Sequence, residues 1–304
     1  MRGSEFEIKV PGSIANLGPG FDTLAVAVEL YLRLSVRVGA GENTLAFRFT
    51  NCPLDGENYI ERAFRFAAQQ RSASFPSLAI EVESEIPLKA GLGSSAAATV
   101  AGLRLFEAVA GSLPAQGLLN AACALENHPD NVAAALLGGL TVSCQLPDRS
   151  VFAVRAPWPE SLGFVVLTPE LALPTAASRK ALPKRVLRED AVFNVQRVAL
   201  LLEALHSGDF SMLREAIRDR LHQPFRQKLA PGLERALALE HPDLLGVCLS
   251  GAGPSIVALG ERNFDAIEKL LEESFRPCGL GYAMRRLRAH QDAHSAPEPA
   301  MPLK

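Results

Sequence analysis

Hydrophobic and polar residues alternate along two stretches near the start of the chain, which predicts strands there. The stretch 24–38 is long enough for a pair of strands or for one long bent strand, and 78–86 predicts another strand. An apolar run rich in alanine, valine and leucine predicts a helix over 94–110. A further helix is expected over 58–70, because Asn58 starts the pattern of a capping box.

Beyond this helix the predicted elements interleave without the regular period of a parallel α/β protein. This pattern favours an α+β fold with two domains, joined by the proline-rich linker Ala156–Gly163. The expected domains cover residues 7–156 and 164–289, and the tail 290–304, rich in proline, alanine and polar residues, is expected to be disordered. The elements predicted here are helices over 114–126, 187–206, 209–220, 231–240 and 263–274, a helix that follows Asn131, and strands over 164–168, 246–249 and 282–288.

The composition of the 304-residue chain narrows its class and its partners. With 48% hydrophobic residues the chain can bury a substantial core, and a formal net charge of −2 gives no overall attraction to nucleic acid or anionic membranes. The five cysteines are widely spaced, which argues against a disulfide framework or a zinc site and fits the reduced cytoplasm. No apolar run is long enough for a transmembrane helix. We therefore expect a cytoplasmic protein that binds neither nucleic acid nor membrane.

The segment Pro87–Ala98 (PLKAGLGSSAAA) connects the predicted strand over 78–86 to the predicted helix over 94–110. Its glycines allow the backbone to approach a ligand closely, and the helix start offers N–H groups at the positive end of the helix dipole. These are features of a phosphate site. The loop is not a Walker A loop, because no lysine follows Gly93. On its own it is equally consistent with an ordinary strand-to-helix connection capped by a serine.

Two further glycine-rich segments change that balance. Pro11–Asp22 lies near the start of the chain, and Leu249–Ser255 lies between two short apolar runs. Together with Gly91–Ser95 and Glu126–Asn131, their spelling and order resemble the motifs of the GHMP small-molecule kinases and, within that superfamily, of the homoserine kinases. The resemblance extends over residues 7–289.

This resemblance implies an N-terminal domain like the second domain of ribosomal protein S5 and a ferredoxin-like C-terminal domain. It implies transfer of a phosphoryl group from ATP, with Mg²⁺, to the hydroxyl of the small molecule L-homoserine, and it suggests a homodimer. The product would be O-phospho-L-homoserine, a step toward threonine. Two alternatives stay open. One is a GHMP kinase for another alcohol such as threonine or mevalonate, and the other is a nucleotide-binding relative without activity.

The resemblance implies a nucleotide-binding site formed by the glycine loop, the start of the following helix and one residue farther away in the sequence. The expected residues are Asn58, Lys89, Ala90, Gly91, Leu92, Gly93, Ser94, Ser95 and Ala96. Asn58 would serve equally well as a helix cap, and Lys89 as a solvated side chain. Ser95 and Glu126 are expected to bind Mg²⁺, which prefers oxygen ligands. A carboxylate at a helix C-terminus is electrostatically unfavourable, so the position of Glu126 needs such a reason.

An amino-acid acceptor needs groups for its carboxylate and its ammonium. Arginine binds a carboxylate through two charge-assisted hydrogen bonds, and Arg179 and Arg226 stand in contexts that resemble those of the family. Thr175 precedes Arg179 in the family's threonine-x3-arginine pattern, and Arg179 is expected among the catalytic residues. Asn16 and Asp22 suit the ammonium, although either would also fix the first glycine turn.

The turn that contains His128, Asp130 and Asn131 lines the amino-acid pocket of the family that the chain resembles. One of Asp130 and Asn131 is expected to cap the following helix, which leaves the other for the substrate. We expect Asp130 to orient the acceptor hydroxyl, because the resemblance implies no strong general base. His128 is an expected substrate neighbour whose role can equally be structural.

Overall fold

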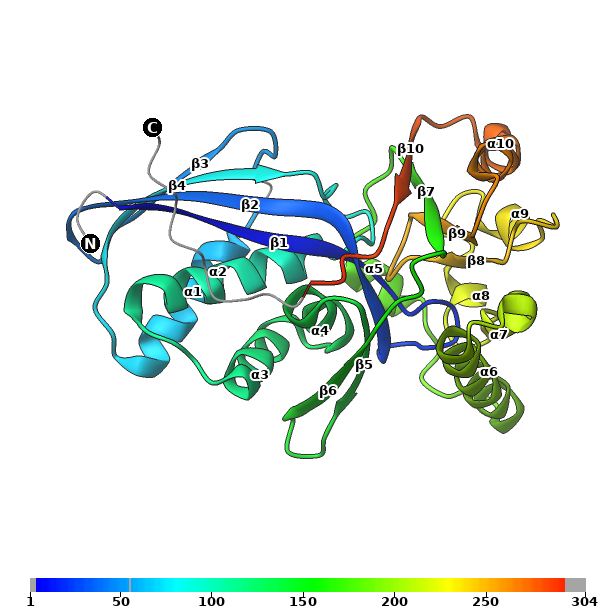
Figure 1. Cartoon of the computed structure of the whole chain (residues 1–304), viewed down its shortest axis with the longest axis horizontal. Helices are drawn as coiled ribbons and strands as arrows, with labels where there is room; N and C mark the ends of the chain where they lie inside the picture. Colours follow the sequence, from blue (N-terminus) through cyan, green and yellow to red (C-terminus); the bar gives the residue numbers. More distant parts are fainter. Residues whose placement is uncertain (1–3, 55, 293–304) are drawn as a thin grey trace.

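The computed structural model describes residues 4–54 and 56–292 of the chain. The strands among these residues form two separate sheets, one in each half of an elongated molecule (Figure 1). The first half holds helices α1 to α4 and the second half helices α5 to α10. This is the α+β arrangement that the interleaved pattern predicts. No helix in the described part of the chain combines the length and the apolar character needed to cross a bilayer.

The first sheet has the strand order β3-β4-β2-β5-β6, with β1 paired to β2. Its strands are β1 (Glu5–Ala15), β2 (Leu24–Glu42), β3 (Leu45–Phe49), β4 (Pro76–Ser84), β5 (Leu140–Gln145) and β6 (Val151–Ala156). Strand β2 is one long strand, which resolves the choice that the alternation over 24–38 left open. Along it Leu34 and Val36 are buried whereas Ser35 and Arg37 are exposed, so that one face of the sheet covers the core.

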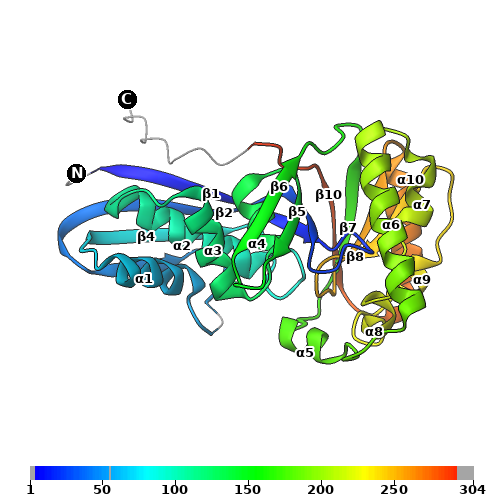
Figure 2. The ribbon, with the colours of Figure 1, turned by 90° about the horizontal axis from the view of Figure 1, so that it is seen from below.

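Helices α1 to α4 pack on one face of this sheet (Figure 2). They are α1 (Tyr59–Arg71), α2 (Ser94–Ala110), α3 (Ala115–Glu126) and α4 (Asp130–Leu137). Helix α2 agrees with the predicted helix over 94–110, and the Asn58 side chain caps α1 by accepting from the Glu61 N–H. Gly102 lets α1 and α2 come close, because a Cβ there would lie 2.2 Å from the Ile60 carbonyl oxygen.

The second sheet is antiparallel and has the order β10-β7-β9-β8. Its strands are β7 (Gly163–Pro169), β8 (Gly246–Leu249), β9 (Ile256–Gly260) and β10 (Tyr282–Leu287). Counted in chain order, this is 4-1-3-2, the order of a ferredoxin-like sheet. The implied ferredoxin-like C-terminal domain is therefore confirmed.

The helices of the second half differ in length from those that the sequence pattern predicts. They are α5 (Thr175–Lys180), α6 (Arg188–Ser207), α7 (Leu213–Ala216), α8 (Gln223–Arg226), α9 (Leu233–Leu237) and α10 (Phe264–Phe275), with 3₁₀ turns η1 (Phe210–Met212) and η2 (Arg276–Cys278). The helical stretches predicted over 209–220 and 231–240 are confirmed only in part, as η1 and α7 over 210–216 and as α9. Asp219 accepts the backbone N–H groups of Leu221, His222 and Gln223, which competes with a continued helix.

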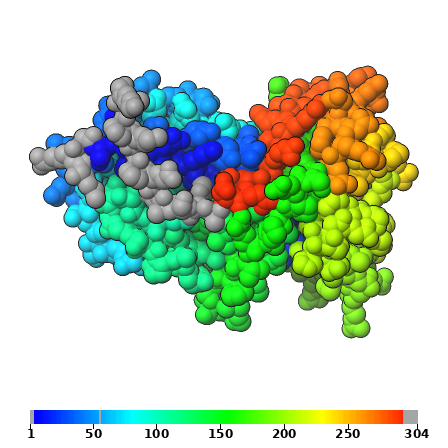
Figure 3. Space-filling model, viewed as in Figure 1, coloured from blue at the N-terminus to red at the C-terminus, as the bar shows by residue number. Residues whose placement is uncertain are grey.

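The two halves are joined by more than the linker 157–162. Trp158 in this linker is buried against Phe164 of β7, with ring centroids 4.9 Å apart. After β10 the chain crosses back to the first sheet, where the His290 N–H donates to the Ala27 carbonyl, so residues 290–292 pack there (Figure 3, red). The rest of the predicted disordered tail, 293–304, lies outside the described residues, and the predicted domain boundaries stay a prediction.

Candidate active site

The three glycine loops, which are far apart in the sequence, meet at the junction of the two halves. The Ser250 Oγ donates to the Gly91 carbonyl at 2.6 Å, and the Gly251 N–H donates to the Ala15 carbonyl at 3.1 Å. Gly91 adopts φ +79°, and a Cβ there would lie 2.3 Å from the Ser250 carbonyl oxygen. Glycine is therefore required here both by the backbone conformation and by the close approach of a second loop.

Replacing Gly91 by alanine should lower the free energy of unfolding by about 2–4 kcal/mol, because left-handed strain and a clash with immobile backbone add. Gly279 is a matched control. It has φ +65° and nothing within 4 Å of a built Cβ, so its alanine variant should lose only about 1–2 kcal/mol. Urea denaturation of both variants measures the difference. Equal losses would show that the two loops do not meet closely.

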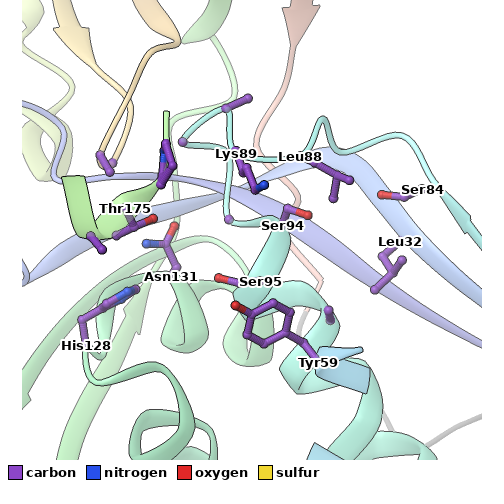
Figure 4. Close-up of a pocket in the computed structure, with 18 of the residues that line it drawn as sticks. Leu32, Tyr59, Ser84, Leu88, Lys89, Ser94, Ser95, His128, Asn131 and Thr175 are labelled. Carbon is purple, nitrogen blue, oxygen red and sulfur yellow. The ribbon is translucent and has the colours of Figure 1, made fainter. Parts of the chain in front are cut away.

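A cavity of about 400 Å³ opens over this junction, a volume within the range of small-molecule sites. One end is mainly apolar, the middle holds the start of α2, and the other end is polar. In Figure 4, Leu32 and Leu88 mark the apolar end, Ser94 and Ser95 the middle, and His128 and Thr175 the polar end. The apolar wall comprises Leu32, Phe49, Cys52, Pro53, Leu54, Tyr59, Ile60, Val82 and Leu88.

The start of α2 faces the middle of the cavity. Its N-cap residue is Gly93 with φ +75°, which has no side chain to bond the first N–H groups of the helix. Ser94 and Ser95 line the cavity at the positive end of the dipole of a 17-residue helix, which suits an anion. Leu92 and Ala96, although predicted with the nucleotide site, have side chains buried in the core and not in the cavity wall.

Glu126, at the end of α3, lies directly behind Ser95. The Ser95 Oγ donates to Glu126 Oε2 at 2.6 Å, and the Thr99 Oγ1 donates to Oε1 at 2.8 Å. The carboxylate is 4% exposed, and an Arg62 nitrogen lies 3.8 Å from Oε1. The structure thus brings the two predicted metal ligands together. The described residues contain no group of three or more His, Cys, Asp or Glu that could hold a metal without help from a ligand.

Asp130 is the first residue of α4 and lies at the polar end; the predicted cap by Asp130 or Asn131 is wrong, because Pro129 is the N-cap and no side chain caps the helix. The Asp130 Oδ1 accepts from His128 Nδ1 at 3.0 Å and from the Asn131 N–H at 2.7 Å. Burial opposes the charge of Asp130, but the bond and charge of His128 prevail and its pKa is lowered. Burial likewise opposes protonation of His128, but Asp130 prevails and the pKa of His128 is raised. Each of the two buried groups therefore favours the charged form of the other beside the cavity.

The amides of Asn16 and Asn131 bond to the protein itself. Asn16 Oδ1 accepts from the Asp22 N–H at 3.1 Å, and its Nδ2 donates to the Gly251 carbonyl at 3.0 Å. Asn16 therefore fixes the first glycine loop, which is one of the two roles expected for it. Asn131 Oδ1 accepts from Ser13 Oγ at 2.7 Å, while its Nδ2 donates to Asp130 Oδ1.

Asp22 and Arg179, predicted separately for the ammonium and the carboxylate, form a two-pronged ion pair with each other. The Arg179 Nη2 and Nη1 lie 2.6 and 3.0 Å from the two Asp22 oxygens. Both side chains are about a third exposed and line the cavity. Helix α5, which carries Arg179 and begins at Thr175, thereby connects to the first glycine loop, between the two halves (Figure 2).

Arg226, in contrast, is buried at 2% exposure, and no carboxylate of the described residues pairs with it. In the described part of the chain its Nη1 donates to the Gly251 carbonyl at 2.9 Å and to His222 Nδ1 at 3.1 Å, and its Nε is unbonded. Burial and the nearby charge of Arg179 lower its pKa to about 10, so the side chain stays charged at neutral pH. A buried cation that bonds only neutral groups is well suited to an anionic ligand.

The remaining predicted residues lie around the nucleotide loop. Asn58 caps α1 and also lines the cavity, so the two roles considered for it are compatible. Lys89 lines the cavity with φ +53°, and its carbonyl accepts from the Leu173 N–H. The Ala90 carbonyl accepts from the Ser255 N–H, which joins this loop to the third glycine loop.

The comparison with known proteins agrees with this geometry. The family models of the N-terminal and C-terminal domains of GHMP kinases match residues 58–139 and 201–277. A homoserine kinase from Solibacter usitatus is 43% identical over 277 residues, covering 90% of this chain and 91% of that protein. The chain belongs to the homoserine kinase family of GHMP kinases. Membership in this family implies ATP as the phosphoryl donor.

Other members of the homoserine kinase family are similar over the same extent. A homoserine kinase from Aquifex aeolicus is 37% identical, covering 88% of this chain and 91% of that protein. The crystal structure of homoserine kinase from Cytophaga hutchinsonii has a TM-score of 0.81 and 26% identity, covering 95% of this chain and 96% of that one. Mevalonate kinase from L. major, with a TM-score of 0.71 and 16% identity, shares the fold.

Sequence reasoning missed several residues of this homoserine kinase site. Tyr59 of α1 and Val82 of β4 line the apolar end but gave no signal as residues of ordinary elements, and Leu88 lies in the glycine loop without having been assigned a role. Thr99 had a signal, because it stands one helical turn after Ser95 and so faces the same side of α2. His222, which bonds Arg226, lies four residues ahead of it in a segment that the pattern assigned to no element.

Proposed function

We propose that this chain catalyses phosphoryl transfer from ATP to the hydroxyl of L-homoserine, giving O-phospho-L-homoserine and ADP. The observation that carries the proposal is one continuous cavity. It joins a helix start that suits an anion to a polar end with the buried cation Arg226 and the carboxylates Asp22 and Asp130. The relatives named as homoserine kinases favour this acceptor over threonine or mevalonate. The predicted cytoplasmic location and homodimer stay predictions.

The nucleotide would occupy the apolar end and the middle of the cavity. Apolar walls that include Tyr59 and Leu88 suit a purine base, and Asn58 stands beside them with a polar group. The phosphates would lie over Gly91–Ser95, where the helix dipole and the serine hydroxyls favour negative charge. Lys89 borders this position and adds a positive charge.

Ser95 and Glu126 would hold Mg²⁺ together with the phosphates. Their oxygen atoms are 2.6 Å apart, and a buried carboxylate at the edge of an anion site fits a hard cation. When bound, Mg²⁺ neutralises phosphate charge. The protein's own part is to fix the Glu126 carboxylate, which the Thr99 hydroxyl does from the next turn of α2.

The polar end would bind the amino acid by its two charged groups. Arg226 would bind the substrate carboxylate, with the charge of Arg179 nearby, and Asp22 would bind the ammonium. Asp22 and Arg179 already form an ion pair with each other. The bound substrate would therefore either add its carboxylate and ammonium to this ion pair or separate the two side chains. Thr175, at the start of α5, borders the same space. Mevalonate has no ammonium to complement Asp22, so an amino acid fits the charges better.

Asp130 would orient the acceptor hydroxyl for in-line attack. A new bond forms between the hydroxyl oxygen and the γ-phosphorus while the bond from that phosphorus to the β–γ bridging oxygen breaks, and ADP and the proton of the hydroxyl are released. The lowered pKa of Asp130 makes it a weak base, so its part is positioning, as expected for a transfer governed by alignment and charge. His128 and Asn131 hold its carboxylate in place.

Replacing Asp130 by asparagine should lower kcat about 10- to 100-fold and leave measurable activity, because alignment is weakened while the phosphate site is retained. Asp148 is a matched control. It lies on the surface with its carboxylate bonded to Ser150, so its asparagine variant should keep the wild-type rate. Steady-state kinetics with both variants measures this. Activity of the Asp130 variant within about twofold of wild type would remove Asp130 from the mechanism.

ADP release tests the proposed function directly. The purified chain is given ATP and Mg²⁺ with L-homoserine, L-threonine, L-serine or mevalonate, and a reaction without acceptor is the control. We expect fast ADP release with L-homoserine only. Faster release with another acceptor would keep a GHMP kinase but refute the assigned substrate. Nucleotide binding without release in any reaction would identify an inactive relative.

A further inference from the structure

His222 lies directly behind Arg226 and is fully buried. Both nitrogens of its ring are bonded. Nε2 lies 2.8 Å from the Gly18 carbonyl of the first glycine loop, and Nδ1 lies 3.1 Å from Arg226 Nη1. One face of the ring stacks on Phe21, with centroids 5.3 Å apart, and Phe21 lines the cavity. His222 therefore links the loop that carries Asp22 to the buried cation of the acceptor end.

These two partners fix the state of the ring. A carbonyl only accepts and a guanidinium only donates, so the hydrogen must be on Nε2 and Nδ1 must be the acceptor. Burial and the charge of Arg226 lower the pKa of His222, against the opposing charge of Asp219, 3.6 Å from Nε2. The ring is accordingly neutral. A protonated ring would turn an N–H group toward the guanidinium and lose the bond to Arg226.

The position of the ring is itself fixed by neighbouring polar groups. The buried Asp219 carboxylate accepts the backbone N–H groups of His222 and Gln223 at 3.0 and 2.7 Å. Asn194 of α6 donates to the same carboxylate at 2.7 Å and to the Pro19 carbonyl at 3.0 Å. The first glycine loop and the segment that carries Arg226 are therefore locked together through buried hydrogen bonds.

An arginine side chain with several rotatable bonds loses conformational freedom when it binds a ligand, unless it is already held. His222 supplies that restraint without neutralising the charge, which a carboxylate partner would do. We infer that His222 is a positioning residue that holds the Arg226 guanidinium ready for the carboxylate of the acceptor. This inference rests on the proposed function, in which Arg226 binds that carboxylate.

Two substitutions separate the two bonds of the ring. In His222→Asn the side-chain oxygen reaches the place of Nδ1 and can still accept from Arg226. In His222→Gln the amide reaches the place of Nε2, so the bond to Gly18 is kept and the acceptor for Arg226 is lost. We expect His222→Gln to raise the KM for L-homoserine about tenfold or more. The KM for ATP should stay within about twofold of wild type. His222→Asn should have a KM for L-homoserine much closer to the wild-type value than that of His222→Gln.

A second acceptor shows whether the effect depends on the carboxylate. 3-Amino-1-propanol has the hydroxyl and the ammonium of L-homoserine without its carboxylate. We expect His222→Gln to leave kcat/KM for this amine unchanged while kcat/KM for L-homoserine falls. Equal losses with both acceptors, equal effects of the two substitutions, or an unchanged KM for L-homoserine would overturn the inference. Wild-type protein without activity on L-homoserine would instead overturn the proposed function, and the inference with it.

If His222→Gln does not fold, nitrogen NMR of the wild-type protein labelled at histidine tests whether His222 positions Arg226. The His222 ring should show a hydrogen on Nε2 and a bare Nδ1, and the Nδ1 signal should shift when L-homoserine binds and not when 3-amino-1-propanol binds. A hydrogen on Nδ1, or an Nδ1 chemical shift that does not change when L-homoserine binds, would contradict a positioning role.

Discussion

Replacing Arg226 by methionine is expected to raise the KM for L-homoserine about 100-fold or more, because loss of a buried charged partner costs about 2–5 kcal/mol and each 1.4 kcal/mol is about tenfold. Arg226 is buried and bonds only neutral groups in the described part of the chain, so its charge is available to the substrate. Methionine keeps much of the volume and removes the charge. The KM for ATP should change little, since the nucleotide loop lies elsewhere in the cavity.

Arg214→Met is the matched control for this substitution. Arg214 also donates to carbonyl oxygens, those of His241 and Leu244, but it lies outside the cavity and is half exposed. Its methionine variant should keep both KM values. If Arg226→Met instead changed kcat alone and left the KM for L-homoserine unaltered, Arg226 would not bind the acceptor carboxylate.

Replacing Glu126 by glutamine should lower kcat about 1000-fold, because the transferred phosphoryl group loses the metal-held neutralisation of its charge, a contribution of several kcal/mol. Glutamine has the same length, and its amide oxygen can accept from one of the Ser95 and Thr99 hydroxyls while its NH2 group donates to the other, so the fold should be retained. Nucleotide binding measured without Mg²⁺ should be unchanged. The loss should therefore appear in kcat and in the dependence of the rate on Mg²⁺ concentration.

Glu107→Gln provides the control for the loss of a buried carboxylate as such. Glu107 also lies in this domain, on α2, and is bonded to Arg104 and to the Leu113 N–H, away from the cavity. This variant should keep the wild-type kcat and Mg²⁺ dependence. A Glu126 variant with a rate within about threefold of wild type would mean that another group holds the metal.

The features that could be predicted from the sequence are those with a local signature. The helix over 94–110 was bounded by glycine at its start and by apolar residues along its length, and it agrees with α2 at both ends. The three glycine loops can meet because glycine has no side chain to keep their backbones apart, as the close approach of the Ser250 carbonyl to Gly91 shows. Ser95 and Glu126 also meet, as the resemblance to the kinases implied.

The features that could not be predicted depend on contacts between distant residues. Asp22 and Arg179 were assigned to opposite charges of the substrate, but they are 157 positions apart and pair with each other in the fold. The apolar end of the cavity is built from β2, β3, β4 and α1, whose residues look like ordinary core positions until the strands are placed side by side. The helical stretch predicted over 209–220 ends at Ala216, because its last residues lead into a turn in which the buried Asp219 carboxylate accepts the backbone N–H groups of His222 and Gln223.

The most direct measurement is the identity of the product formed from ATP, Mg²⁺ and L-homoserine, read by proton-coupled phosphorus NMR together with the amount of ADP. We expect one phosphate monoester whose signal is split by a neighbouring CH₂ group, formed in equal amount with ADP. ADP without a phosphorylated amino acid, or phosphate on the amine or the carboxylate, would contradict phosphoryl transfer to the hydroxyl of L-homoserine.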